Sequence, residues 1–403
     1  MKAGWTNKTL ADVCTVFADG DWIESKDQST DGIRLIQTGN VGEGEFKDRS
    51  DKARYISEET FARLRCTEIF EGDCLISRLP DPVGRSAILP DTGERMITAV
   101  DCTIVRFDQT LCLPTFFNYY SQSTEYINNI AERCTGTTRN RISRSQLGNT
   151  TLPIPSIKEQ HRIVTLLDEA FADIATAKAN AEKSLQNAHE LFESHLDAIV
   201  TNAQTNGELV PLSELATDIT DGDHMPPPKV EQGLPFITIG NIDKQTRVID
   251  FSDTFQVPRE YFDGLKANKK PMRGDVLYTV TGSFGIPVLV EEDKEFCFQR
   301  HIGLIRPKAD VDSTWLHYLL QSPQVFNQAA DGATGTAQKT VSLKVLRNLQ
   351  VPKTSTKEQL AHVETLKSVE TECRRLESIY RQKLTALEDL KKSLLHHAFT
   401  GQL

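Results

Sequence analysis

The stretch TGTTRNRISRSQL at residues 135–147 returns as TGTAQKTVSLKVL at residues 334–346, and the tripeptide KEQ follows each copy, at 158–160 and 357–359. The repeat distance is about 200 residues, which is the length of a whole domain rather than of a solenoid repeat. Two copies are also too few to build a shared solenoid core, so each copy must bury its own. The sequence therefore predicts a tandem duplication, with two equivalent sites related by a pseudo-two-fold axis.

Other landmarks recur in the same order in both halves. Each half contains an Asp-Gly-Asp turn, a Gly-Asn dipeptide after a β-rich run, and a Gly-Asp dipeptide before another such run. The matching segments are 19–21 and 221–223, RLIQTGNV from Arg34 and PFITIGNI from Pro235, and EGDCLISR from Glu71 and RGDVLYTV from Arg273. The duplication therefore covers the whole chain.

Composition bounds the class of protein. The 403 residues, 38% of them hydrophobic and 25% charged, are enough for two ordinary domain cores. No apolar run approaches the roughly 20 residues of a membrane span, and the N-terminal sequence MKAGWTNKTL lacks the apolar segment of a signal peptide. We therefore expect a cytosolic protein. The eight cysteines form no Cys-x-x-Cys pair and share no position between the repeats, which favours reduced, packed thiols over disulfides or a structural metal.

Charge is distributed unevenly. A net charge of −10 argues against a protein that wraps nucleic acid without specificity, because phosphate binding requires Lys and Arg. Four arginines and one acidic residue nevertheless lie between Glu132 and Ser145, and three basic residues and no acidic residue lie between Thr334 and Arg347. These basic clusters coincide with the best-preserved segment of each repeat, which indicates a polyanionic partner.

Each repeat has the pattern of a mixed α/β domain followed by a long helix. Gly, Pro and Asp separate short β-rich runs, and a helix is expected near residues 113–130 and near residues 314–328. The expected fold class is α+β, with two tandem-duplicated domains separated by two long helices. The expected boundaries are 1–155 for the first domain, 156–205 for the first helix, 206–353 for the second domain and 354–403 for the second helix.

A capping box marks the start of each long helix. Ser156 precedes Glu159 by three residues, and Ser355 precedes Glu358 by three residues. In such a box the Ser oxygen and the Glu side chain satisfy backbone donors that the first turn leaves open. The two helices therefore begin at equivalent positions of the two repeats.

Both long helices carry one apolar stripe. The first stripe comprises Ile163, Leu166, Ala170, Ile174, Ala177, Ala181, Leu185, Ala188, Phe192, Leu196 and Ile199. The second comprises Val363, Leu366, Val369, Cys373, Leu376, Tyr380, Leu384, Leu387, Leu394 and Ala398. The first stripe advances in steps of 3, 4 and 4 residues, which predicts a nearly straight helix or a slight right-handed supercoil.

A helix of about 45 residues with such a stripe is not stable alone in water. The first stripe is rich in Ala where the second is rich in bulky side chains. We therefore expect the two helices to pack on each other in antiparallel, coiled-coil-like fashion, with interdigitating side chains. The alternative is that each helix folds back on its own domain.

Motifs of catalysis are missing from the sequence. It contains no Gly-x-x-x-x-Gly-Lys-[Ser/Thr], no Gly-x-Gly-x-x-Gly, no His-Glu-x-x-His, no Gly-x-Ser-x-Gly and no Asn-Pro-Pro-[Tyr/Phe]. The nuclease-like letters at 292–294 have no counterpart in the first repeat. The segment 221–224 resembles a metal cluster, but the first repeat has Trp22 where the second has His224, which favours a turn. The pair His396 and His397 lies at a helix end, where a solvated pair is expected.

The Thr-Gly stretch and the Gly-Asn turn supply the candidate binding residues. Hydroxyls, backbone amides and Lys or Arg together are what phosphate positioning requires; the alternative is a glycine turn with solvated arginines. We expect Arg139, Arg141 and Arg144 to contact phosphates, with Lys339 and Lys344 as their counterparts. The full candidate set is Gln37, Thr38, Asn40, Thr137, Arg139, Arg141, Ser143, Arg144, Thr238, Asn241, Thr336, Lys339, Ser342 and Lys344.

These features together resemble the specificity subunit of type I restriction–modification systems over the whole chain. The resemblance rests on GNV at 39–41 and GNI at 240–242, on Gly-Asp at 72–73 and 274–275, on the Thr-Gly stretch that runs into PIPSIKEQHRIV or VPKTSTKEQ, and on the C-terminal LLHHAFTGQL. Any one of these motifs is common, whereas their duplicated order is specific to the family.

The resemblance implies two target recognition domains, each of which reads one half of a split double-stranded DNA sequence, separated by helices that act as a molecular ruler. It also implies two methyltransferase subunits that use S-adenosylmethionine, and restriction subunits that use ATP and Mg. No catalytic residue, cofactor, metal or membrane contact is then expected in this chain, which would act in the prokaryotic cytoplasm. Because the domains diverge between their landmarks, the two half-sites should differ.

Two other functions are kept as alternatives. One is a single-chain DNA-modifying enzyme or tandem nuclease, which would require catalytic motifs that the sequence lacks. The other is a coiled-coil scaffold without a DNA role, which predicts no salt-dependent DNA binding. The sequence does not identify the bases that are read, because base readout depends on which side chains enter the groove.

Overall fold

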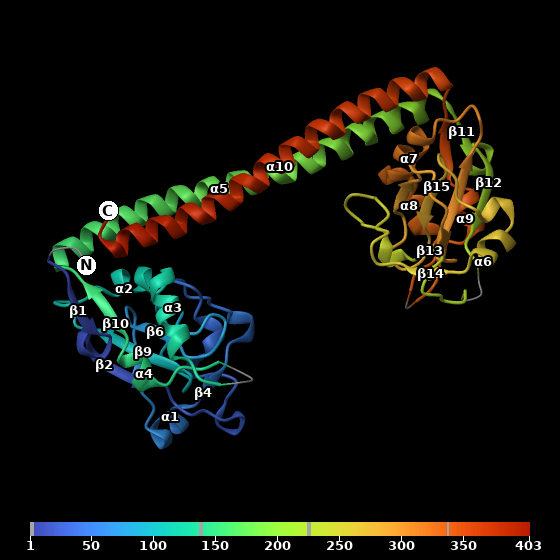
Figure 1. Cartoon of the computed structure of the whole chain (residues 1–403). Coiled ribbons are helices and arrows are strands. Elements are labelled where there is room, and N and C mark those ends of the chain that lie inside the picture. The colour runs from blue at the N-terminus through green and yellow to red at the C-terminus, as the bar shows by residue number, and fades with distance from the viewer. Residues whose placement is uncertain (1–3, 137–139, 224–226, 337) are drawn as a thin grey trace. The chain divides into compact units, whose positions relative to one another are not determined.

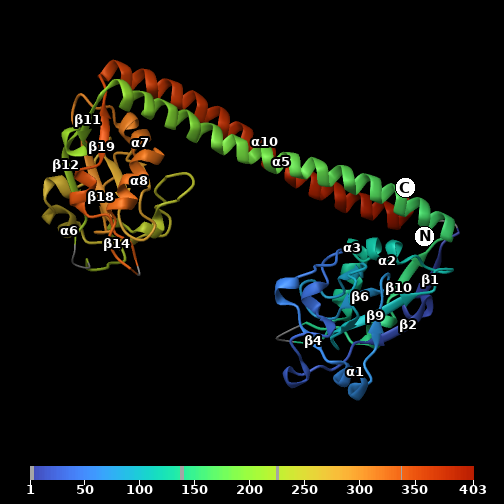
Figure 2. The ribbon, with the colours of Figure 1, turned by 180° about the vertical axis from the view of Figure 1, so that it is seen from behind.

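The computed structural model describes residues 4–136, 140–223, 227–336 and 338–403, and these divide into two compact units. Unit 1 contains residues 1–182 and 382–403, and unit 2 contains residues 183–381. Each unit combines one domain with a segment of each of the two long helices, α5 (Ile157–Asn206) and α10 (Thr356–Thr400). Figure 1 and Figure 2 show both units, and each is described by itself.

Unit 1 contains two four-stranded sheets and one two-stranded sheet, in the orders β2-β9-β6-β7, β4-β3-β8-β5 and β1-β10. The pair β3 and β8 is parallel, and the other pairs are antiparallel. The strands are β1 (Thr6–Thr9), β2 (Cys14–Asp19), β3 (Ile33–Ile36), β4 (Tyr55–Ile56), β5 (Glu68–Ile69), β6 (Cys74–Ser77), β7 (Ser86–Ile88), β8 (Met96–Thr98), β9 (Cys102–Phe107) and β10 (Thr151–Ile154). The shorter helices are α1 (Glu58–Leu64), α2 (Pro114–Tyr120), α3 (Thr124–Arg133) and α4 (Arg144–Gly148).

Unit 2 repeats this arrangement, with sheets ordered β12-β18-β15-β16, β14-β13-β17 and β11-β19. Its strands are β11 (Glu208–Pro211), β12 (Ala216–Asp221), β13 (Leu234–Ile237), β14 (Phe255–Val257), β15 (Val276–Thr279), β16 (Pro287–Leu289), β17 (Cys297–Phe298), β18 (Ile302–Pro307) and β19 (Gln350–Lys353). Its shorter helices are α6 (Arg259–Gly264), α7 (Ser313–Gln321), α8 (Pro323–Gly332) and α9 (Leu343–Arg347). The main four-stranded sheet has the same order and pairing in both units, so the predicted duplication of a mixed α/β domain is confirmed.

The preserved Gly-Asp dipeptides place a buried carboxylate at the start of an inner strand of each main sheet. Asp73 and Asp275 are each 2% exposed. Asp73 receives two hydrogen bonds from Arg106 of β9, at 2.7 and 2.6 Å, and Asp275 receives two from Arg306 of β18, at 2.9 and 2.8 Å. Each pair joins neighbouring strands of the sheet, so this motif serves the fold.

The preserved KEQ tripeptides place a buried glutamine in the first turn of each long helix. The side chain of Gln160 accepts a hydrogen bond from the Leu113 amide and donates to the carbonyls of Leu111 and Pro155. Gln359 makes the equivalent bonds with the Asp312 amide and the carbonyls of Asp310 and Thr354. Three orphan backbone groups are thereby satisfied at each site, and the helix start is fixed to its domain.

The serine of each predicted capping box acts as a helix cap. Ser156 Oγ accepts from the Glu159 amide, and Ser355 Oγ accepts from the Glu358 amide. Glu358 completes the box by accepting from the amide of Ser355. The carboxylate of Glu159 also receives two hydrogen bonds from Arg162.

In unit 1 the beginning of α5 meets the end of α10 on top of the domain. Ile163 and Leu167 of α5 share one core with Leu395, Ala398 and Phe399 of α10. The same core includes residues of α2 and α3, which lie between the helix pair and the main sheet (Figures 1 and 2). The predicted packing of the two helices on each other is therefore confirmed at this place, and the first turns of α5 also contact the domain.

In unit 2 the end of α5 meets the beginning of α10. Leu196 and Val200 of α5 lie in one core with Val363 and Leu366 of α10, and that core continues into the main sheet of the unit. In each unit the start of one helix thus lies against the end of the other. The two helices are therefore antiparallel, as predicted.

The predicted stripes are wrong in one position. Leu166 is 40% exposed, whereas Leu167 is 1% exposed, because the first turns of α5 face the domain core as well as α10. The other positions of the first stripe, from Ala170 to Ile199, are buried or half-buried, so the predicted spacing holds there. On α10 all positions of the predicted stripe are buried or half-buried.

The cysteines are free, as predicted, and most are buried. Burial raises the pKa of the Cys74 thiol to about 12, so it stays protonated near neutral pH. Among the described residues, no group of three or more His, Cys, Asp or Glu side chains is arranged to hold a metal ion. Within the same part of the chain, no helix is both long enough and apolar enough to cross a membrane.

We predict that removing a buried carboxylate of the Gly-Asp motif destabilises its unit. Asp275→Ala leaves Arg306, whose side chain is 17% exposed, without its partner, and breaking such a buried pair costs roughly 3 kcal/mol. The midpoint of urea unfolding should fall accordingly. The matched control is Glu372→Ala, which removes an exposed arginine pair on α10 and should leave the midpoint unchanged. An equal effect of both variants would contradict the assignment.

We also predict that unit 2 loses stability in mild acid through His317 of α7. Burial lowers the pKa of His317 from 6.5 to about 4, and the charges of Arg247 and Arg374 act in the same direction. A histidine with a lowered folded-state pKa contributes stability above the unfolded pKa, and this stability is lost as the pH falls from 6.5 to about 4. The loss amounts to about 3 kcal/mol at most.

Urea unfolding between pH 7 and pH 4 measures this effect. In His317→Gln the pH dependence across that range should become shallower, because the neutral side chain has no proton to gain. The same substitution at the exposed His195 should leave the pH dependence unchanged. A variant of His317 with the pH dependence of the wild type would contradict the prediction.

Candidate nucleic-acid interface

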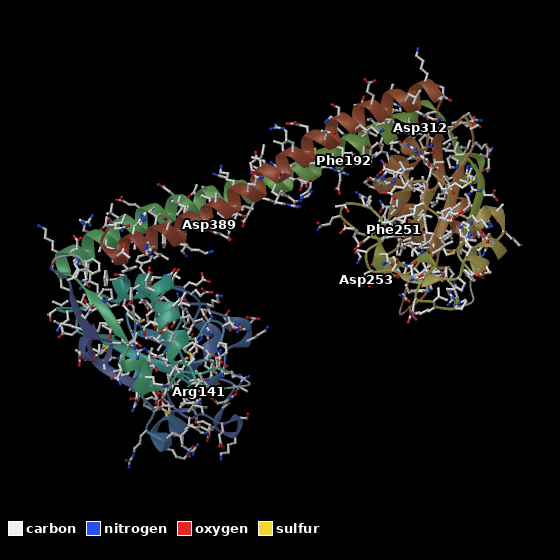
Figure 3. All side chains as sticks on the ribbon, viewed as in Figure 1. Arg141, Phe192, Phe251, Asp253, Asp312 and Asp389 are labelled. Atoms are coloured by element: carbon white, nitrogen blue, oxygen red, sulfur yellow. The ribbon has the colours of Figure 1, made fainter. Side chains whose placement is uncertain are left out.

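One edge of the main sheet of unit 1 collects the candidate loops. Because β9 is antiparallel to β2 and β6, the ends of β2 and β6 lie beside the start of β9, with Asp19 opposite Thr103 and Ser77 opposite Cys102. The Thr-Gly stretch joins this edge, since the Ile142 amide donates to the Arg78 carbonyl. Figure 3 shows Arg141 on the side of unit 1 that is turned away from α5 and α10.

The second sheet brings the Gly-Asn turn to the same edge. The Ala99 amide donates to the Ile36 carbonyl at the end of β3, and the Asp21 amide donates to the Thr98 carbonyl at the end of β8. Gln37, Thr38 and Asn40 follow directly after β3. They therefore lie beside the loop that precedes β9.

Arg85 ties these loops together, and sequence analysis did not single it out. Its guanidinium donates to the carbonyls of Thr38 and Val41 on one loop, and to those of Leu79 and Pro82 on the next. Burial lowers the pKa of Arg85. Because Arg85 contacts carbonyls of both loops, it fixes the distance between them. The sequence alone does not show these contacts.

The asparagines of the Gly-Asn turns are engaged inside their own loops. Asn40 is 9% exposed, accepts from the Gln37 amide and donates to the carbonyls of Lys47 and Asp48. Asn241 is 8% exposed, accepts from Thr238 and donates to the Asp253 carbonyl. Their amides shape the loops. Gln37, Thr38 and Thr238 are half-buried, and the Gln37 and Thr238 side chains also take part in capping boxes within the loops.

The described part of the Thr-Gly stretch in unit 1 presents two arginines held by acidic partners. Arg141 Nη2 lies 2.8 Å from Asp101 Oδ1, and Arg144 Nη1 lies 3.6 Å from Asp19 Oδ2. Ser143 caps α4, with Gln146 completing the capping box. The candidates Thr137 and Arg139 lie outside the described residues.

Unit 2 presents the equivalent stretch with a different set of side chains. Thr336, Lys339, Ser342 and Lys344 are exposed. Ser342 caps α9, as Ser143 caps α4. No ion pair links Lys339 or Lys344 to a carboxylate within the described residues, so both ammonium groups are available to an anion.

The predicted counterparts of the arginines are wrong. An antiparallel β-bridge joins the backbone of Thr135 to that of Arg141, and an equivalent bridge joins Thr334 to Thr340. Arg141 therefore corresponds to Thr340. Since the caps Ser143 and Ser342 correspond, Arg144 corresponds to Leu343. Lys339 and Lys344 instead occupy the positions of Asn140 and Ser145. When the two stretches are aligned by their backbone, the basic residues of one are shifted by one position from those of the other. The prediction had paired the basic residues by their charge alone.

Three further residues of the edge in unit 1 escaped sequence analysis. Arg78 is 5% exposed, its Nη2 lies 3.3 Å from Asp19 Oδ1, and it donates to the Val100 carbonyl. Asp19 therefore lies between Arg78 and Arg144, and Asp101 accompanies Arg141. The only sequence signal was the recurrence of Asp19 in the Asp-Gly-Asp turn. Side chains of three arginines thus converge on one loop-built edge, which suits an anionic, shaped ligand such as DNA.

Comparison with known proteins agrees with this geometry. Residues 2–185 and 204–386 each match the Type I restriction modification DNA specificity domain. The chain is 24% identical over 311 residues to the type I restriction enzyme EcoBI specificity subunit of Escherichia coli, covering 71% of this chain and 65% of that subunit. It is 24% identical to the StySPI specificity subunit of Salmonella potsdam over 434 residues, covering 100% of this chain and 90% of that protein.

Fold comparison gives the same relationship. A chain from a structural study of complex assembly and conformational transition of the type I R-M system superposes with a TM-score of 0.81 at 19% identity, covering 100% of this chain and 99% of that chain. At this identity the likeness concerns the fold alone. The alignment with the EcoBI subunit leaves about a third of that relative unmatched.

We predict that the exposed lysines of the second stretch contribute affinity without sequence preference. Lys344→Ala should weaken binding to all duplex DNA sequences alike and reduce the slope of log affinity against log salt by about one. Filter binding or fluorescence anisotropy over a salt series measures both quantities. Lys353→Ala, at an exposed position on β19, is the control of equal charge and should change neither. A change in the preferred sequence caused by Lys344→Ala would contradict the phosphate assignment.

Proposed function

Because the chain belongs to the family of type I restriction–modification DNA specificity proteins, we propose that it binds double-stranded DNA at an asymmetric bipartite site, with one half-site for each domain. Two copies of the specificity domain follow each other in the chain. The observation that carries the proposal is that both domains form the same loop-bearing sheet edge with the same backbone hydrogen bonds, while the side chains on the two edges differ. One scaffold with two different edges is what a split, asymmetric sequence requires.

Specificity subunits are non-catalytic, and the catalytic activity of type I systems lies in other subunits. We propose that this chain docks two methyltransferase subunits, which bind S-adenosylmethionine, and restriction subunits, which bind ATP and Mg. The antiparallel helices α5 and α10 would then set the number of unread base pairs between the half-sites. An enzyme function of the chain itself is disfavoured by the missing catalytic motifs.

Exchange of one domain tests whether each domain recognises its own half-site. Replacing residues 1–155 with the same segment of another family member should change one half of the methylated sequence and leave the other half unchanged, because each domain has its own core. The measurement is the methylated motif in the genome of a strain that expresses the chimera with its methyltransferase subunits. Replacement of residues 206–353 is the reciprocal experiment. A chimera that alters both halves would refute the proposal.

A further inference from the structure

The two sheet edges differ in chemistry at four of five equivalent positions. The backbone fixes the equivalence, because Arg78 and Val280 make matching bonds. Their amides donate to the carbonyls of the residues that precede β9 and β18, which are Asp101 and His301. Their carbonyls accept from the amides of residues 142 and 341. The pairs, first unit before second, are Asp19 and Asp221, Arg78 and Val280, Asp101 and His301, Arg141 and Thr340, and Arg144 and Leu343. At these five positions unit 1 has three arginines and two aspartates, whereas unit 2 has one aspartate, one histidine and three uncharged residues.

This difference separates the two possible roles of Arg141. The phosphate backbone is chemically the same in both half-sites, so side chains that contact phosphates are expected to be basic in both units. Base edges differ between the half-sites, so side chains that read them are expected to differ. Arg141 is replaced by Thr340 in the equivalent place, which is the behaviour of a residue that reads bases.

The carboxylates beside the arginines support the same assignment. The side chains of Asp19 and Asp101 are 31% and 30% exposed, next to Arg144 and Arg141, whose side chains are each 48% exposed. A half-exposed carboxylate repels phosphate and cancels most of the local positive charge. Arg141 and Arg144 each pair with one of these acids, whereas no ion pair of Lys339 or Lys344 is found among the described residues.

The same carboxylates suit an arginine that must be held in one orientation. Asp101 lies directly before β9, and its backbone accepts a hydrogen bond from the Arg78 amide, so it belongs to the rigid part of the sheet. Its Oδ1 forms an ion pair with Nη2 of Arg141 at 2.8 Å. The guanidinium offers several N–H donors in a planar fork, and among the described residues Asp101 is the one acidic residue that pairs with it, so donors remain for a ligand. Donors fixed by a rigid partner select one acceptor geometry.

We propose that Arg141, oriented by Asp101, donates to the O6 and N7 acceptors of a guanine and so specifies a G·C pair in the half-site bound by unit 1. This assignment rests on the proposed function. Arginine is the side chain that recognises guanine through two parallel hydrogen bonds in the major groove. Unit 2, with Thr340 at this position, has no such contact. Arg141 is the specificity-determining residue, and Asp101 positions it.

Selection from a randomised duplex library tests the proposal, with the full chain co-expressed with its methyltransferase subunits and the bound DNA sequenced. The wild type should select a motif with an invariant G·C pair in one half. In Arg141→Ala the preference for that pair should fall by about 10-fold to 100-fold, and the other half-site should stay unchanged. Arg141→Lys keeps the charge but loses the fork, so it should fail to restore the preference.

Two further variants complete the design. Asp101→Asn removes the orienting charge and should reduce discrimination at the same G·C pair. Thr340→Ala in unit 2 is the matched control, and it should leave that pair as invariant as in the wild type. Both substituted side chains of unit 1 are partly exposed, and the bridge at Arg141 is made by the backbone, so folding should be retained.

The outcomes separate the two proposals. A wild type that selects no sequence at all would refute the proposed function itself. A wild type that selects a bipartite motif, with Arg141→Ala weakening all sequences equally and Arg141→Lys restoring affinity, would make Arg141 a phosphate contact and overturn the inference alone. Unchanged binding of Arg141→Ala would overturn it as well. If Asp101→Asn tightens binding to every sequence without loss of discrimination, the acid serves only to offset charge.

Discussion

The buried glutamine at the start of each long helix is the constraint on which the rest of the structure depends. Gln160 and Gln359 are 0% and 3% exposed, and each satisfies one amide and two carbonyls that would otherwise be buried without partners. Leaving such groups unpaired costs roughly 1 to 3 kcal/mol each. The helix therefore cannot leave its domain without exposing or orphaning these groups, and the domain and helix start behave as one body.

Within each domain, the residues that stabilise the fold differ from the residues at the candidate DNA-binding edge. Buried Asp–Arg pairs, buried glutamines and serine caps use side chains that recur in both repeats, and they all lie in the sheet or at a helix start. The edge residues are held instead by backbone hydrogen bonds, such as those that join residues 142 and 341 to residues 78 and 280. Because backbone bonds do not depend on the side chain, the edge can change its chemistry while its geometry persists.

The sequence was sufficient for the parts of the structure that recur. Duplicated landmarks predicted two mixed domains, and the serines at 156 and 355 predicted where the long helices begin. The apolar pattern was less reliable where a helix has two partners. Leu166 and Leu167 are both apolar, and the exposed one could be identified only from the domain surface that α5 covers. Periodicity alone treats a helix as if it had one neighbour.

The candidate site was harder to predict because its residues meet only through the fold. Arg78, Asp19 and Asp101 lie far apart in sequence, and the recurring segments that contain Asp19 and Arg78 do not indicate that these residues meet, whereas Arg141 and Arg144 stood out by charge density. The preserved Asn40 was a candidate because it recurs, yet recurrence there reflects a loop that needs its side-chain bonds. In a duplicated protein with two different targets, residues shared by the repeats indicate structure, and residues that differ at equivalent places indicate specificity.

Burial limits how freely such an edge can vary. Arg78 is almost fully buried, and a buried charge is tolerated only with a partner, here Asp19 and the Val100 carbonyl. In unit 2 the equivalent Val280 is apolar and needs no partner, and the equivalent Asp221 lies 3.9 Å from Lys269 instead. Exchange of Arg78 for an apolar residue would leave Asp19 with Arg144 as its remaining cation, so these three residues are coupled. The edge consequently changes in coupled sets of residues, which explains why the two units differ at several neighbouring positions together rather than at one.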